Sequence, residues 1–476
     1  MTGTPALDTA TLELFWHDGD AREVRLRQVI SERLALQPPP AREDAVVATY
    51  FMALRSTRLE KAVAEIAYHA TSGIKNAPAG SLLARCTAQP AGVDLFDSTG
   101  RLGLLHVAFP LKMMLQPDGH LTSCDLLHTA AAAILFDVYE NQDSRLLALQ
   151  IPEAVLRTFP GPAHGPKGFR RLCDLPPGEP AFGTILKPTA GLTAEEVGKL
   201  TGEAAASPLL SFIKEDEDLY PNLAYAPMGE RTRLAVEAIR RAADQRGGRG
   251  LVFLPHVSGT PGEILATVEA ALEAGAEGVM FSESFAGGTV RMVREAFRMQ
   301  PPLIYGHNAG IGVKTRAIWR EAIDLLARLD GIDFRQTAPV RPGTPFLKPY
   351  GQEWSASEEI LSRPLPGIAP AVLVRAGALD QGNIGLNLAE AEARGLGDGV
   401  MFLAGSAINS IKNAQGKYDP ALGARAMQQA IEVHRAGTLR EVKAEEHLRE
   451  LVALAEREKL AELREALRQR YPQKAA

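Results

Sequence analysis

The chain has 476 residues, of which 46% are hydrophobic and 23% are charged, and its net charge is −5 at neutral pH. This composition is typical of a globular protein, and the length predicts about two or three domains. The sequence has no basic tract, no closely spaced cysteine pair and no apolar run of about 20 residues, which argues against nucleic-acid binding, a zinc site and a membrane span. A cytoplasmic location without a signal peptide is expected.

The first 160 residues mix strand and helix patterns. Residues 1–44 are polar, include Pro38-Pro39-Pro40, and are expected to be an extension. The predicted elements that follow are a strand at 45–51, a helix at 58–70, strands at 81–86 and 103–109, and a helix at 121–138. This mixed order predicts an α+β domain over residues 45–160. The dense Pro and Gly of residues 159–166 is typical of a linker.

Short apolar runs alternate with amphipathic helices after this linker. The runs predict strands at 184–187, 211–214, 251–255, 278–281, 303–306, 333–336, 371–374 and 399–403. The clearest helices between them are 193–206, 230–245, 261–274 and 314–329. Eight such units match a (β/α)8 TIM barrel, here expected over residues 161–440. An open doubly wound sheet is the alternative, although the chain has no GxGxxG or Walker loop.

The Ala-, Glu-, Leu- and Arg-rich residues 421–470 are helical by composition. The barrel is therefore expected to be followed by a helical tail over residues 441–476.

Residues 211–217 carry the most informative pattern, an apolar strand that runs into Lys214-Glu215-Asp216-Glu217. Side chains alternate along a strand, so Lys214 and Asp216 share one face and Glu215 takes the other. Glu217 follows where the strand gives way to a loop. Adjacent carboxylates with open positions suit Mg2+, but a lysine ammonium among them would repel the metal.

The carboxyl ends of barrel strands surround the site in this fold. In strand order, the residues found there are Lys187; Lys214, Asp216 and Glu217; His256; Glu283; His307 and Asn308; Gln336; Arg375 and Gly377; and Gly405 and Ser406. Small residues after strands seven and eight let backbone N–H groups approach a phosphate. For His256 and Glu283, which stand out by position alone, an ordinary structural role is favoured.

Three motifs resemble those of the RuBisCO large-subunit family. Residues 182–192 are similar to its GTIxKPKxGL signature, residues 212–217 to its FxKDDE metal motif, and residues 158–165 to its TFxGPxHG linker. The motifs occur in the family's order and spacing. The resemblance covers roughly residues 45–440.

The resemblance implies a use for the lysine of the acidic motif. Lys214 would react with CO2 to form a carbamate, and this carbamate would bind Mg2+ together with Asp216 and Glu217. Lys187 resembles the lysine that acts as the base in substrate enolisation, a role that a lysine can fill when burial and nearby positive charge lower its pKa. His307 resembles an active-site histidine of the family.

Other positions depart from the family pattern. The loop after strand six lacks a lysine at the place used in carboxylation, where Arg341 is only a possible substitute and Lys348 lies further on. The second lysine of the KPK signature is Thr189. In the grip on one phosphate, the family's arginine and the histidine that helps it are replaced by Asn308 and Gln336, and the family's serine on strand seven is replaced by Arg375. The glycine-bearing grip is partly kept, at Gly377 and Gly405.

The resemblance also implies a homodimer, or a larger oligomer of dimers, in which the N-terminal domain completes the partner's site. The family's N-terminal site residues differ here as well. An acidic residue is replaced by His69, an asparagine by Asp137, and a Thr-Trp pair by Ile74-Lys75. Lys75 and Asp137 are therefore candidate substrate-binding residues.

These departures make the chain resemble the RuBisCO-like proteins, which do not fix CO2. The expected activity is Mg2+-dependent enolisation, by proton abstraction, isomerisation or decarboxylation next to a carbonyl, of a small phosphorylated sugar-like substrate. A non-catalytic protein that binds a metabolite or serves as a scaffold is the alternative, and ribulose-bisphosphate carboxylation is a weaker one. The sequence does not identify the substrate.

Overall fold

The computed structural model describes residues 19–285, 287–340, 346–347 and 352–473. They form two compact units. The first contains the described residues up to Gly161, residues 310–330 and the described part of 346–368; the second contains residues 162–309, the described part of 331–345 and 369–473.

The first unit is built on an antiparallel sheet with strand order β2-β3-β1-β4. Its strands are β1 (Ala45–Leu54), β2 (Gln89–Leu95), β3 (Leu102–Pro110) and β4 (Asn141–Gln150). The helices before and within this region are α2 (Gly19–Leu36), α3 (Leu59–His69), α4 (Leu82–Cys86), α5 (Leu111–Met114), α6 (Ser123–Phe136) and α7 (Glu153–Leu156). The predicted α+β domain is confirmed.

Both faces of the central strand β1 are covered, which explains why all ten of its residues are buried. Tyr50 and Met52 lie in a core with Val63 of α3 and Leu126 of α6. Phe51, on the opposite face, belongs to a second core that includes α2 residues. The extension expected before residue 45 therefore contains a helix, while residues 1–18 lie outside the described part of the chain.

Two predicted elements of this unit are wrong. The segment 81–86 is the short helix α4 rather than a strand, because the Ser81 side chain accepts a hydrogen bond from the Ala84 N–H and caps a helical turn. The helix predicted at 314–329 is divided into α13 (Ile311–Lys314) and α14 (Arg320–Asp330). Between them Ile318 makes a parallel bridge to Leu146 of β4, which interrupts helical pairing.

The second unit contains eight parallel strands in the order β10-β11-β12-β15-β16-β5-β6-β9. A parallel bridge between His256 and Met280 joins the two end strands, so the sheet closes into a barrel. The strands are β5 (Ala181–Ile185), β6 (Phe212–Lys214), β9 (Val252–Leu254), β10 (Gly278–Phe281), β11 (Leu303–Gly306), β12 (Phe334–Thr337), β15 (Val372–Ala376) and β16 (Val400–Ala404). The predicted barrel is confirmed and the open sheet is wrong.

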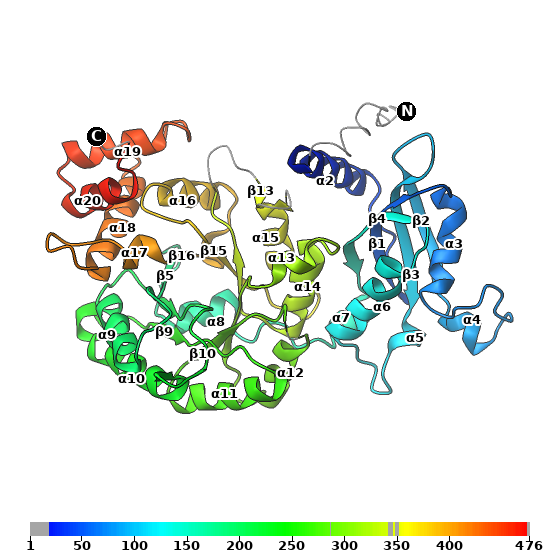
Figure 1. Ribbon diagram of the computed structural model, residues 1–476, viewed down its shortest axis with the longest axis horizontal. Coiled ribbons are helices and arrows are strands. Elements are labelled where there is room, and N and C mark those ends of the chain that lie inside the picture. Colours follow the sequence, from blue (N-terminus) through cyan, green and yellow to red (C-terminus); the bar gives the residue numbers. More distant parts are fainter. Residues whose placement is uncertain (1–18, 286, 341–345, 348–351, 474–476) are drawn as a thin grey trace. The chain divides into compact units, whose positions relative to one another are not determined.

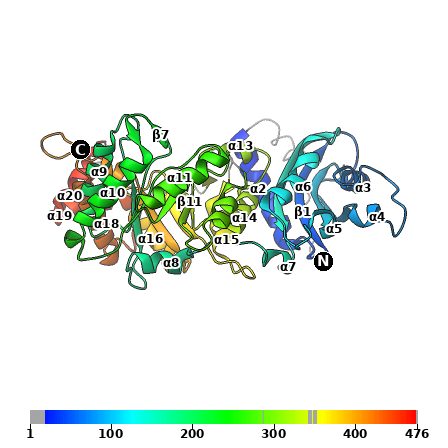
Figure 2. The same ribbon diagram turned by 90° about the horizontal axis from the view of Figure 1, so that it is seen from below.

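Helices lie outside this barrel, as Figures 1 and 2 show for α9, α10 and α11. Those of the second unit are α8 (Gly165–Leu172), α9 (Ala194–Ala205), α10 (Met228–Arg241), α11 (Pro261–Glu273), α12 (Thr289–Ala296), α16 (Ile384–Ala393) and α17 (Ser406–Asn409). Helix α15 (Trp354–Ser362) belongs to the first unit with α13 and α14. The minor elements are β7 (Asn222–Leu223), β8 (Ala226–Pro227), β13 (Phe346–Leu347), β14 (Gln352–Glu353) and the turns Asp244–Arg246 and Gly397–Gly399.

Helix α18 (Pro420–Arg435) follows the last barrel strand, and the segment expected as a tail contains α19 (His447–Arg457) and α20 (Ala461–Arg470). They lie together beside α16 and α17 at the red end of the ribbon in Figure 1. Leu463, Ala466 and Leu467 of α20 are buried, so the tail packs on its own unit instead of standing free.

The buried carboxylate of Asp333 anchors the segment that was predicted as a linker. It accepts hydrogen bonds from the backbone N–H groups of His164 at 2.7 Å and Gly165 at 3.2 Å, and from that of Ile304 at 3.0 Å. The Arg294 guanidinium forms an ion pair with it. These bonds precede β12 and therefore lie at the end of the barrel opposite the carboxyl ends of its strands.

Candidate active site

The barrel interior explains which side chains reach its mouth. Alternate strand positions, among them Phe212, Tyr305 and Phe334, fill the barrel with a buried cluster. Because side chains alternate along a strand, the next inward position after Phe212 is Lys214, and the next after Tyr305 is His307. The same alternation places Gln336 after Phe334. Three predicted site residues therefore share the inner face of the barrel near the carboxyl ends of its strands.

Lys214 is fully buried at this level. Its Nζ donates a hydrogen bond to the Glu215 carbonyl at 2.9 Å and lies 5.4 Å from the centre of the Tyr305 ring. Burial lowers the pKa of the Lys214 amine to about 8, although the Glu217 and Asp216 carboxylates act in the opposite direction. A lowered amine pKa gives more of the neutral form, which is the nucleophilic form of a lysine.

Asp216 is buried and faces a cation from the neighbouring strand. The Lys187 Nζ lies 2.5 Å from Asp216 Oδ2, and about a third of the Lys187 side chain is exposed. This ion pair joins the ends of β5 and β6. It brings the predicted base and a predicted metal ligand into contact, and it shows that the Asp216 carboxylate can hold a positive charge in this position.

Glu217 and His307 lie close together, with 3.3 Å between Glu217 Oε2 and His307 Nε2. His307 Nδ1 accepts a hydrogen bond from the Ala309 N–H, so this nitrogen carries no proton and the proton of the neutral ring is on Nε2. Burial, followed by the Lys214 charge, lowers the pKa of His307 to about 2. His307 is therefore neutral, and its protonated Nε2 is the ring atom that faces Glu217.

Glu215 lies on the outer side of its strand, as the alternation predicts. Its carboxylate accepts two hydrogen bonds from the Arg231 guanidinium, at 2.8 and 2.9 Å, and both side chains are fully buried. It also accepts the His256 N–H at 2.9 Å. Arg231 donates in addition to carbonyls of the loop after β6, those of Leu219, Tyr220 and Ala226. The pair thus fixes the loop that follows the acidic motif.

Replacing Arg231 by methionine is expected to destabilise the fold by about 3–5 kcal/mol, because Glu215 would remain buried without its partner. Urea unfolding followed by circular dichroism measures the change. Arg233→Met, which removes an exposed ion pair with Glu237 on the same helix, is the matched control and should cost under about 1 kcal/mol. Equal effects of the two substitutions would contradict a structural role for the buried pair.

His256 and Glu283, the two strand-end residues for which a structural role is favoured, both form side-chain hydrogen bonds within the protein. His256 Nδ1 donates to the Leu219 carbonyl at 3.1 Å, and its Nε2 lies 2.5 Å from Ser258 Oγ. Burial lowers the pKa of His256 to about 4. Glu283 accepts a hydrogen bond from Arg335 at 2.7 Å.

Tyr305 is a site residue that the sequence interpretation missed. Its hydroxyl donates to Gln336 Oε1 at 3.0 Å, and its ring lies beside the Lys214 amine. It could have been found from the sequence, because it stands two positions before His307 and therefore on the same face of β11. Asn308, the next predicted residue, is partly exposed at the end of the same strand.

The predicted phosphate loops follow β15 and β16. Gly377 is exposed with φ +90°, a conformation that L-residues rarely adopt, and its position has no heavy atom near an added Cβ. The backbone at Gly405 is fixed by Asn409, whose side-chain amide donates hydrogen bonds to the carbonyls of Gly405 and Ile185. Ser406 is exposed beside it. The described residues therefore leave this part of the mouth lined by small side chains.

Arg375 is placed away from the mouth. It is fully buried, forms an ion pair with Glu390 and donates to the Asn387 carbonyl at 3.0 Å, both on α16. Its neighbours Val374 and Ala376 belong to the inner cluster, so Arg375 lies on the outer face of β15. The structure thus does not bring this predicted substrate-binding residue together with the others. Arg341 and Lys348 lie outside the described residues.

The donor set at the mouth fits a magnesium ion only if Lys214 takes part. Within the described residues, no three His, Cys, Asp or Glu side chains converge as a metal site. Asp216 and Glu217 offer two carboxylates, and the electrostatic effect of both on Lys214 shows that its amine lies near them. Conversion of this amine to a carbamate would supply the third oxygen ligand that the two acids lack.

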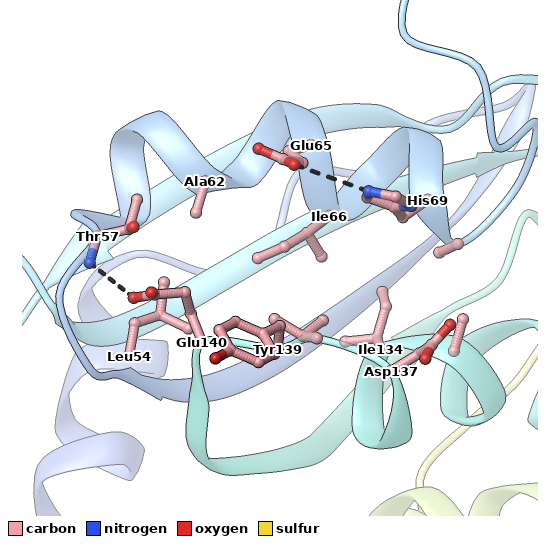
Figure 3. Close-up of a pocket in the computed structure, with 13 residues that line it drawn as sticks. Leu54, Thr57, Ala62, Glu65, Ile66, His69, Ile134, Asp137, Tyr139 and Glu140 are labelled. Carbon is pink, nitrogen blue, oxygen red and sulfur yellow. Dashed lines mark hydrogen bonds and ion pairs between the residues drawn. The ribbon is translucent and has the colours of Figure 1, made fainter.

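A separate cavity of about 440 Å³ lies in the first unit, between α3 and the residues that follow α6 (Figure 3). His69 and Glu65 of α3 lie on one side of it, 3.7 Å apart, and Asp137 and Tyr139 lie on the other. The cavity thus brings together His69 and Asp137, two positions at which the chain departs from the family pattern. Lys75 is exposed and is not among the residues that line it.

None of the helices in the described part of the chain is both long enough and apolar enough to cross a membrane.

The family model of the ribulose bisphosphate carboxylase large chain, catalytic domain, matches residues 170–343. These residues include strands β5 to β12 and all of the acidic motif.

Two curated proteins are similar in sequence, one over less than half of this chain and one over more than two thirds of it. The 3-oxo-isoapionate-4-phosphate transcarboxylase/hydrolase of Xanthobacter autotrophicus is 33% identical over 44% of this chain and 50% of its own length. The 3-oxo-isoapionate-4-phosphate decarboxylase of Rhizobium etli is 28% identical over 72% of this chain and 78% of its own length. The chain thus matches only half of the first relative.

Among solved structures, the octameric ribulose-1,5-bisphosphate carboxylase/oxygenase of Pyrococcus horikoshii is similar in fold, with a TM-score of 0.74. The comparison covers 90% of this chain and 94% of that one at 21% identity. At this identity the similarity establishes the two-part architecture and no more.

Proposed function

Because this chain belongs to the RuBisCO large-chain family, we propose that it catalyses decarboxylation of a phosphorylated 3-oxo sugar acid through enolate chemistry at Mg2+, without fixing CO2. The observation that carries the proposal is the convergence of Lys187, Lys214, Asp216, Glu217 and His307 at the carboxyl ends of β5, β6 and β11.

Lys214 as its carbamate, Asp216 and Glu217 would hold the metal ion. When bound, Mg2+ supplies Lewis-acid stabilisation of negative charge on the substrate's carbonyl oxygen. Two of the three protein ligands have a side-chain partner, since Asp216 pairs with Lys187 and Glu217 contacts His307, and the backbone of the motif is fixed through Glu215. Such supporting contacts are typical of metal sites.

Lys187 is proposed to move the proton. When the carbon–carbon bond to the carboxylate breaks, CO2 leaves and the electron pair passes to the adjacent carbonyl as an enolate. The Lys187 Nζ, at the open end of β5, then delivers a proton to the carbon that lost CO2. As a neutral amine, the same Nζ would instead remove a proton from the carbon next to the carbonyl. One residue could therefore serve either decarboxylation or isomerisation.

The substrate class is supported by the two curated relatives, whose names both specify 3-oxo-isoapionate-4-phosphate. A 3-oxo acid suits this site because its carbonyl stands next to the carbon from which CO2 leaves. A single phosphate suits it because Asn308 and Gln336, both uncharged, stand at the grip where the family pattern has an arginine and a histidine.

Incubation of the full chain with 3-oxo-isoapionate-4-phosphate, bicarbonate and Mg2+ tests the proposal. We expect release of CO2 that requires both the metal and prior exposure to bicarbonate. Parallel reactions with ribulose 1,5-bisphosphate and labelled CO2 are expected to incorporate no label. Incorporation would establish a carboxylase, and a lack of turnover together with a lack of Mg2+ binding would favour a non-catalytic protein.

We further propose that the protein is a homodimer or an oligomer of dimers, in which the cavity with His69 and Asp137 faces a partner's barrel. Exposed Phe136 and Tyr139, each nearly 90% accessible beside this cavity, support a covered surface. Light scattering of the full chain tests this proposal, and a monomer at micromolar concentration would exclude it.

A further inference from the structure

A cation from the helical tail stands at the loops that follow the last two barrel strands. Arg470 ends α20, and its Nη1 lies 3.5 Å from Ser406 Oγ, next to Gly405. Its Nε and Nη2 lie 3.4 and 3.3 Å from Asp380 Oδ2, four residues beyond the end of β15. None of the family motifs in the sequence contains this arginine.

Asp380 positions Arg470 but is bonded more closely to other groups. The Tyr471 hydroxyl donates to Asp380 Oδ2 at 2.6 Å, and the Gly382 N–H donates to Oδ1 at 2.8 Å. Arg470 forms an ion pair with Asp380, and its contacts with Asp380 and Ser406 are all 3.3 Å or longer, so the hydrogen bonds among these groups are weak. The guanidinium is thus held in place while its donors can still form shorter bonds to an anion.

The surroundings of Arg470 are suited to a phosphate group. Gly377 and Ala378 are exposed with φ +90° and +59°, and Ser406 offers an exposed hydroxyl. Small residues at this place let an oxyanion come close to the backbone. Arginine binds phosphate through paired, charge-assisted hydrogen bonds, which a lone hydroxyl or backbone N–H cannot match.

We propose that Arg470 is a phosphate-binding residue of the barrel site, supplied by the tail to the loops after β15 and β16. The identity of its ligand as the substrate's phosphate rests on the proposed function. Asn308 and Gln336 supply no cation at the first phosphate position. The loops after β15 and β16 would then be the remaining phosphate position, and Arg470 adds a cation there. The tail is then part of the binding site as well as a structural element.

Titration of the full-length protein with inorganic phosphate, followed by calorimetry, tests the proposal. Replacing Arg470 by alanine is expected to weaken phosphate binding by about tenfold, the effect of losing one charge-assisted pair. The matched control is Arg468→Ala on the same helix, because Arg468 is half-exposed and pairs with Glu456 at 3.1 Å. This control removes the same charge and is expected to change phosphate affinity by less than about twofold.

A second variant separates binding from tail docking. Tyr471→Phe removes the shortest hydrogen bond between the tail and Asp380 but leaves the arginine cation in the chain. If Arg470 binds phosphate, Tyr471→Phe weakens binding less than Arg470→Ala, and Arg470→Lys retains part of the affinity. Equal losses in Tyr471→Phe and Arg470→Ala would overturn the proposal in favour of a structural clasp.

Two further outcomes would also overturn it: unchanged phosphate affinity in Arg470→Ala, or no phosphate binding by the unmodified protein at millimolar concentration. This titration uses neither substrate nor metal. Phosphate binding through Arg470 can therefore be observed even if the protein releases no CO2, and CO2 release can be observed even if Arg470 binds no phosphate. With a turnover assay in hand, Arg470→Ala is expected to raise KM about tenfold with little change in kcat, the mark of lost binding rather than lost chemistry.

Discussion

Methionine in place of Lys214 is expected to make the protein inactive and, at neutral pH, more stable. Lys214 is fully buried, and burial lowers the pKa of its amine from the ordinary 10.5 to about 8, so its charged form is unfavourable in the folded state. That difference corresponds to a penalty of about 3 kcal/mol, which methionine removes. The same substitution removes the proposed third metal ligand and is expected to lower turnover by at least about 10³-fold.

The pH dependence of this stability gain has a defined sign. Between pH 8 and 10.5 the unfolded lysine binds a proton that the folded lysine has lost, so the stability of the unsubstituted protein rises with pH across this window. Below pH 8 the penalty is complete. The stability difference between the Lys214→Met variant and the unsubstituted protein is therefore largest below pH 8 and disappears above about pH 10.5.

Urea unfolding at several pH values without bicarbonate or metal measures the gain, and CO2 release measures the loss. Lys199→Met on α9 is the control, because Lys199 is largely exposed and its ion pair with Glu203 is long. Activity within tenfold of normal in Lys214→Met, or a less stable folded state, would contradict the proposed role of this lysine.

Replacing Lys187 by methionine is expected to separate chemistry from metal binding. Turnover falls by about 10²–10⁴-fold, the usual contribution of a positioned proton donor or acceptor. Mg2+ binding is retained or becomes tighter, because the Asp216 carboxylate loses the ammonium group that lies 2.5 Å from it. Lys214→Met is expected to differ, because it loses metal binding as well as activity.

Calorimetric titration with Mg2+ in bicarbonate buffer, beside the CO2-release assay, checks this prediction. In D2O a deuteron enters the product whether or not Lys187 delivers it, but its delivery to a single face of the enolate should be lost in the variant. If Lys187→Met lost metal affinity as strongly as Lys214→Met, Lys187 would be part of the metal site and not the residue that moves the proton.

Periodicity predicted the barrel well because each of its strands is a short buried run between helices. The bounds of β10 and β11 agree residue for residue with the prediction, and β5 begins three residues earlier than expected. Ser81 shows the limit of the method: an apolar segment of six residues fits either a strand or a capped helical turn, and here the Ser81 hydroxyl caps a helix.

The site was predictable where alternation along a strand fixes the direction of a side chain. The inward placement of Lys214 and the outward placement of Glu215 follow from it, and the outward placement of Arg375 would have followed had Val374 been assigned to the interior. Arg470 could not have been predicted, because its position depends on how α20 packs some ninety residues beyond Asp380. The tautomer of His307 depends equally on a backbone N–H.

The division of the site among the strands has a consequence for how such enzymes change. The groups proposed for chemistry lie at the ends of β5, β6 and β11, where the consecutive residues Glu215, Asp216 and Glu217 each contact a different partner. The groups proposed for recognition lie at the ends of β11 to β16 and on α20, on other elements than Lys187, Lys214 and Asp216. New substrates can therefore be acquired by altering the second group alone, which makes these loops the natural target for directed evolution of specificity.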